Sequence, residues 1–182
     1  MSERLAHDHA ELNSLLSELW LALESGEVQQ IHSRLDLFWA RLAIHIRAEH
    51  LQLFPAILRP LRGNLKDTGP APALTVVQNS IKELSFDHDF FMHELAGAIK
   101  TVRGLRQITD PQLVDERLES VKTRVAAVEE RLSAHNMLEE EGIYLWAGEL
   151  LSNAEQSALA ARLREELEKM PPRFAYASVA EE

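Results

Sequence analysis

The sequence predicts an all-α protein, an antiparallel up-down-up-down four-helix bundle with an additional C-terminal helix. Apolar residues recur every three or four positions along most of the chain, and strictly alternating apolar runs are rare. Only seven Gly and seven Pro interrupt the 182 residues. Short and moderate connections between four long helical segments favour antiparallel neighbours.

The first half of the chain predicts two of these helices. The first covers residues 2–24, and Gly26 lies where a helix commonly ends. The second covers 28–58, and Pro55 is expected to kink its last turns because proline has no amide hydrogen.

The second half repeats this arrangement after a Gly- and Pro-containing loop over 62–73. The third helix is expected over 75–105, and the fourth opens at Asp110-Pro111 and continues to 151. These elements predict one bundle domain over residues 1–151, a helix over 152–170 packed on the bundle or at a dimer contact, and a flexible tail over 171–182.

Composition excludes several functional classes. The absence of cysteine rules out disulfides, thiolate metal ligation and a cysteine nucleophile. A net charge of −10 makes a nucleic-acid partner unexpected, because nucleic-acid binding relies on a clustered basic face. Neither a secretory leader nor a membrane span is visible, so we expect a cytoplasmic protein. Eight histidines among abundant carboxylates remain, a ligand set that suits iron, zinc or manganese.

Each of the four predicted core stripes contains a histidine, and the second and fourth also contain a glutamate one turn later. An unpaired buried carboxylate costs several kcal/mol or is forced to take up a proton, so two of them would be a liability without a cation. A metal resolves this conflict, because residues four apart project from one side of a helix. The candidate metal ligands are His9, His45, Glu49, His88, His135 and Glu139.

The chain also repeats itself internally. Each half offers one histidine in its first helix and a His-x-x-x-Glu pair in its second. Two such arms suggest two metal ions, with a carboxylate from each arm able to bridge them. Three protein donors per ion would leave open positions for a small ligand.

This order of motifs resembles the hemerythrin-like (HHE cation-binding) domain family over about residues 2–150. The resemblance implies an antiparallel four-helix bundle around two non-haem iron ions with oxo and carboxylate bridges, and favours iron over zinc or manganese. The six candidates would be the ligands, with both glutamates as bridges. Oxygen-carrying members have a further histidine where this chain has Met92 and an aspartate where it has Glu139, which argues against simple reversible oxygen carriage.

The resulting functional hypothesis is a metal-binding protein that binds or senses O2, NO or a peroxide, or handles iron. A di-iron enzyme that reduces peroxide or O2, or repairs iron centres, is the alternative, and so is a regulatory module with zinc or an empty site. Repair proteins of related fold typically carry a cysteine-bearing segment, which weakens that version here. The expected partner is a small diatomic or peroxide ligand, and a homodimer is possible.

Polar residues near the motifs have several open roles. His50 and His93 are candidates for an additional ligand or an outer contact. Asp8 and Asp87 precede ligand histidines and are expected either to orient an imidazole or to face solvent. On solvated faces we expect His7 and His32, and in core packing Tyr144.

Overall fold

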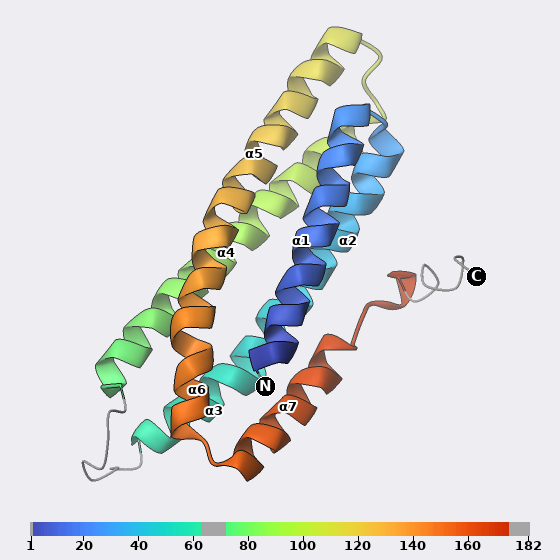
Figure 1. Ribbon diagram of the computed structural model, residues 1–182. Helices are drawn as coiled ribbons and strands as arrows, with labels where there is room; N and C mark the ends of the chain where they lie inside the picture. The colour runs from blue at the N-terminus through green and yellow to red at the C-terminus, as the bar shows by residue number, and fades with distance from the viewer. Residues whose placement is uncertain (1, 63–71, 175–182) are drawn as a thin grey trace.

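The computed structural model describes residues 2–62 and 72–174, and these parts of the chain contain helices and no strand. The all-α prediction is therefore confirmed. Four long helices lie side by side in Figure 1, and α1 contacts α2 and α5, while α4 contacts α2 and α5, so that they enclose a common core. Their bounds are Ser2–Ser25 for α1, Val28–Ala48 for α2, Leu74–Leu105 for α4 and Pro111–Leu138 for α5.

Two of these helices continue through a π turn into a shorter helix. After α2 come the π turn η1 (Glu49–Leu53) and α3 (Phe54–Arg62). After α5 come the π turn η2 (Glu139–Ile143) and α6 (Tyr144–Leu150). The predictions of one helix over 28–58, kinked at Pro55, and of another from 111 to 151 did not include these π turns.

The predicted end of the second helix at residue 58 was also wrong, because α3 continues past Pro60 to Arg62. Proline removes a single amide donor, and burial of Phe54 and Ile57 holds α3 against the bundle nonetheless. Most of the predicted loop over 62–73 lies outside the described residues.

The C-terminal helix α7 (Asn153–Leu167) packs on α2 and η1 and ends three residues before the predicted boundary at 170. Ser152 caps it in a reciprocal arrangement with Glu155, in which each side chain accepts from the other's backbone N–H. A 3₁₀ turn, Pro172–Phe174, follows, and the rest of the predicted tail lies outside the described residues.

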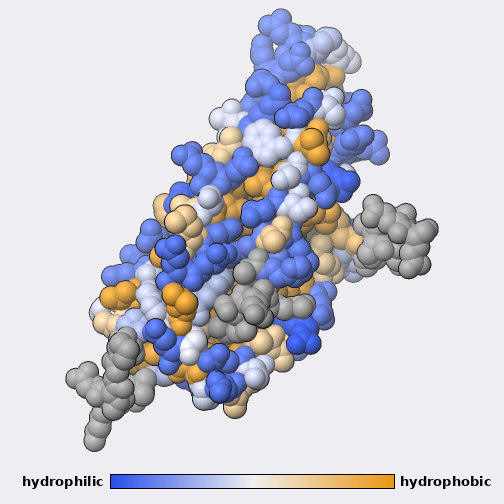
Figure 2. Space-filling model, in the orientation of Figure 1, coloured by the Kyte–Doolittle hydropathy of each residue, from blue (hydrophilic) through white to orange (hydrophobic). Residues whose placement is uncertain are grey.

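The apolar core consists of two clusters. One fills the end of the bundle formed by the α1–α2 and α4–α5 connections, and the other fills the end near α3, α6 and α7. The candidate ligands lie between them: His9 follows Leu5 of one cluster and precedes Leu12 of the other. On the face shown in Figure 2, hydrophilic side chains surround scattered hydrophobic ones. No helix in the described part of the chain is long and apolar enough to cross a membrane.

Candidate metal centre

All six predicted ligand residues converge between the two apolar clusters, and each is at most 3% exposed. They form two groups of donors that share Glu139, and within each group the donor atoms lie within 4.8 Å of one another. The first group is Glu49, His88, His135 and Glu139, and the second is His9, His45 and Glu139.

The two glutamates lie between the groups, and each directs one oxygen to each side. Glu49 Oε1 lies 3.5 Å from His45 Nε2, and its Oε2 lies 3.3 Å from His88 Nε2. Glu139 Oε2 lies 3.1 Å from His9 Nε2, and its Oε1 lies 3.1 Å from His135 Nε2. This is the arrangement that a pair of bridging carboxylates requires.

The outer nitrogen of every ligand histidine has a partner. His45 Nδ1 lies 2.6 Å from Asp8, and His135 Nδ1 lies 3.2 Å from Asp87. An Nδ1–H donated outward fixes the tautomer and leaves the Nε2 lone pair facing the centre. The remaining two pairs are His9 Nδ1 with Glu140 at 2.8 Å and His88 Nδ1 with His50 at 2.9 Å.

Both aspartates thus act across helices, on the histidine of the following helix. Each is also held by an arginine located four residues before that histidine: Arg41 contacts Asp8, and Arg131 Nε donates to Asp87 at 2.5 Å. The role of the aspartates was left open by the sequence, and neither arginine was predicted. Their signal was the repeat of Arg-x-x-x-His-x-x-x-Glu in the two arms.

The π turns bring Tyr144, which the sequence analysis assigned to packing, into the centre. Its hydroxyl lies 3.1 Å from His9 Nε2 and from Glu139 Oε2, and 3.5 Å from Glu49 Oε1. Five positions along an ideal α-helix leave two residues about 140° apart. In η2, however, the N–H of Tyr144 bonds to the Glu139 carbonyl five residues back, so the two side chains share one face.

The surroundings shift the pKa values of the two buried carboxyl groups in opposite directions. Burial and the nearby Glu139 charge raise the pKa of Glu49 well above its usual range. Burial opposes ionisation of Glu139 as well, but close contacts with the imidazoles of His135, His45 and His9 outweigh it and hold the pKa of this carboxyl well below its usual range. Of the two carboxyl groups, Glu139 therefore loses its proton at the lower pH.

The histidines respond to the same environment. Burial and the neighbouring His135 lower the pKa of His88 to about 3, so its ring is neutral at pH 7, the form that binds a metal. Burial alone would lower the pKa of His45, but the carboxylates of Glu49 and Glu139 raise it overall. Burial lowers the pKa of His50, which keeps this ring neutral and able to accept from His88.

Two further observations indicate that these residues fit a metal ion. Glu49 Oε2 and Glu139 Oε1 are buried and accept no hydrogen bond in the described structure. The Nε2 atoms of His88 and His135 face each other at 3.1 Å, so two outward-donating rings would oppose their lone pairs there. A cation between these atoms would satisfy the carboxylate oxygens and both nitrogens.

The remaining histidines lie elsewhere. His7 is exposed beside Glu11, and His32 accepts from Arg103 Nε at 3.1 Å. His93 is exposed and lines a groove with Arg124, so the described contacts do not connect it with the centre.

Comparison with known proteins supports the resemblance seen in the sequence. The model of the hemerythrin HHE cation binding domain matches residues 1–147. Searches of the curated proteins and of the solved structures found no match. Because the family match covers most of the chain and includes every residue of the buried His and Glu cluster, the chain belongs to the hemerythrin HHE cation-binding family.

Proposed function

We propose that this chain is a non-haem di-iron protein, an up-down-up-down hemerythrin-like bundle whose centre binds or senses O2, NO or a peroxide. The observation that carries the proposal is the placement of Glu49 and Glu139, each with one oxygen toward each donor group. Two carboxylates that each have histidines on both sides, one of them shared by both donor groups, favour a dinuclear site over a single ion. Nitrogen and oxygen donors without cysteine suit iron.

When bound, an iron pair would supply open coordination positions and a ferrous–ferric couple. The chain's own residues would hold the imidazoles in one tautomer through Asp8 and Asp87 and limit water access through the two apolar clusters. Tyr144 would place a neutral hydroxyl beside both carboxylates, because burial and the charge of Glu139 raise its pKa well above 10.

A second candidate is an enzyme that reduces a peroxide or O2, and the same hydroxyl favours it. Oη of Tyr144 is a buried hydrogen-bond donor within 3.5 Å of both glutamates, where a reduced oxygen ligand would need a proton. Sustained peroxide consumption that Tyr144→Phe lowers, with iron content unchanged, would favour the enzyme. A single oxidation without turnover would favour binding or sensing.

Metal analysis tests the proposal first. Protein reconstituted with ferrous iron should hold about two irons per chain, as expected from two donor groups. His135→Ala should lower this content. His32→Ala is the matched control, because His32 lies outside both donor groups. One tightly held zinc, or iron content unaffected by His135→Ala, would contradict the proposal.

Spectra test the ligand. The reduced, iron-loaded protein should show a new absorption band on mixing with O2 or NO, and the ligand that gives a stable, reversible band is the physiological candidate. No change with O2, NO or peroxide would leave metal binding in place and overturn the proposed ligand class.

A further inference from the structure

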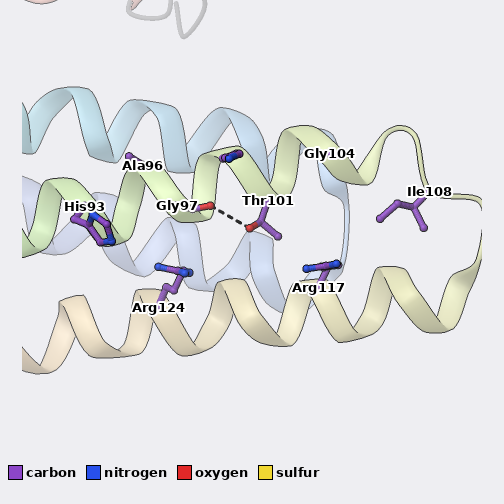
Figure 3. A pocket seen from close by; sticks show the side chains of 9 residues that line it. His93, Ala96, Gly97, Thr101, Gly104, Ile108, Arg117 and Arg124 are labelled. Atoms are coloured by element: carbon purple, nitrogen blue, oxygen red, sulfur yellow. Dashed lines mark hydrogen bonds between the residues drawn. The ribbon is translucent and has the colours of Figure 1, made fainter.

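A groove of about 690 Å³ runs between α4 and α5, toward the end of the bundle away from α3 and α7 (Figures 1 and 3). No residue of the buried metal cluster lines it. Its volume is in the range of small-molecule sites.

Two glycines of α4 open the groove. Gly97 and Gly104 are seven residues apart, so they lie on the same face two turns apart. Glycine inside a helix lowers helix stability by up to about 1 kcal/mol relative to alanine, so two glycines on one face weaken α4. A Cβ at position 97 would lie 2.9 Å from Arg124 Nη1, whereas a Cβ at position 104 would meet nothing within 4 Å. The first glycine therefore lets a guanidinium lie close against α4, and the second leaves the groove open.

Two arginines of α5 match these glycines in register. In an antiparallel pair, seven residues forward on one helix correspond to seven residues back on the other. Because Arg124 lies against Gly97, Arg117 is expected opposite Gly104. Figure 3 shows Arg117 and Arg124 on the α4 side of α5, along the groove. Seven residues of helix place them about 10.5 Å apart along the axis.

The groove contains more positive side chains than acidic partners that neutralise them. Arg124 donates to Glu94 at 2.7 Å and keeps a side chain that is 35% exposed. Arg117 and Lys100 have no hydrogen-bond or ion-pair partner among the described residues. On a chain of net charge −10, two unpaired cations in one groove favour an anionic ligand.

We propose that this groove binds a small organic molecule with two phosphate groups at opposite ends. One phosphate would contact Arg124 and the other Arg117, since a planar guanidinium matches phosphate with two parallel hydrogen bonds. Lys100 adds charge between the two ends, and the open space at Gly104 leaves room for the phosphate beside Arg117.

Titration calorimetry with fructose 1,6-bisphosphate as the probe, at 150 mM salt, tests this proposal. We expect saturable binding of one molecule per chain that is at least tenfold tighter than binding of fructose 6-phosphate, because one phosphate can engage only one end. Arg117→Gln should lower affinity for the bisphosphate about tenfold or more and remove its advantage over the monophosphate. Gly104→Leu, which has space for its Cβ, should block binding while the chain stays folded.

Arg34→Gln is the matched control, because it makes the same charge change at an arginine that pairs with Glu18 away from the groove. It should leave affinity unchanged. Absence of saturable binding, equal affinity for the two sugars, or an equal loss in Arg34→Gln and Arg117→Gln would overturn the proposal. None of these outcomes depends on iron, so they are independent of the proposed function of the centre.

Discussion

The two halves of the chain build the centre on one plan. Residues 2–62 and 74–150 each supply an Asp-His pair on their first helix and an Arg-x-x-x-His-x-x-x-Glu arm on their second. In each half the aspartate contacts the arginine and the histidine of that arm, and a π turn begins at the glutamate. The scaffold that positions the donors is therefore repeated almost residue for residue.

The halves differ in what surrounds the donors. The residue after the glutamate is His50 in the first arm, where it contacts His88, and Glu140 in the second, where it contacts His9. The residue that follows the π turn is Phe54 in the first arm, stacked on His88 with ring centroids 6.3 Å apart, and Tyr144 in the second.

The second arm thus supplies a hydroxyl and a carboxylate, whereas the first supplies an imidazole and a phenyl ring. Coverage differs too, since α7 packs on α2 and η1 of the first half. Ligand positions are therefore symmetric, while the hydroxyl and the additional carboxylate beside them come from the second half.

We expect the largest effect on iron content when the two glutamates are replaced one at a time. Glu139 belongs to both donor groups and Glu49 to one, so Glu139→Gln should lower iron from about two per chain to near zero, and Glu49→Gln to about one. Iron analysis after reconstitution and desalting measures both. Equal losses would show that the two carboxylates contribute alike.

A smaller effect separates the two aspartates. Removing a carboxylate that orients a ligand histidine typically lowers metal affinity about 10–100-fold. Asp8→Asn should fall at the larger end, because Asp8 is 2% exposed, and Asp87→Asn at the smaller end, because Asp87 is 7% exposed and its Arg131 partner is more open to water. Competition with a chelator measures each affinity. The reverse order would mean that solvent access does not decide the difference.

Helical periodicity could predict residues that lie on one regular helix. It could not predict residues whose position depends on a π turn or on a neighbouring helix. The π turn begins only at Glu49, and the backbone N–H of Glu49 still bonds to the His45 carbonyl four residues back, so helical periodicity places this pair correctly. Tyr144 lies beyond the π turn, where a period of 3.6 residues assigns the wrong face. Contacts between helices, such as that of Asp8 with His45, depend on the relative rotation of two helices, which no single-helix pattern contains.

Tyr144→Phe makes the second arm resemble the first, which has Phe54 at the matching position. In metal-free protein the pKa of Tyr144 lies well above 10, because of burial and the charges of Glu139 and Glu49. Tyr144 should then contribute nothing to the absorbance rise at 295 nm up to about pH 10.5, so wild type and Tyr144→Phe should show the same rise. A larger rise in wild type would contradict the shielded hydroxyl.

The raised pKa of Tyr144 also makes the free energy of unfolding depend on pH. A folded-state pKa above the unfolded value leaves stability unchanged below pH 10, and stability falls as rising pH ionises the unfolded chain first. The free energy of unfolding of wild type should therefore fall more steeply above pH 10 than that of Tyr144→Phe. Parallel curves from urea titrations would contradict this expectation.

The smallest expected effect concerns the packing of α7 on the first half of the chain. Ser152→Ala removes the N-cap of α7 and should lower the free energy of unfolding by about 1 kcal/mol, or about 2–4 °C in Tm. Iron content should not change, because the cap lies outside both donor groups. The other end of α7 does reach toward the centre, since Arg41 donates to the Leu167 carbonyl at 2.9 Å and also contacts Asp8. Loss of iron in Ser152→Ala would therefore show that docking of the whole helix, through this arginine, helps to hold the centre.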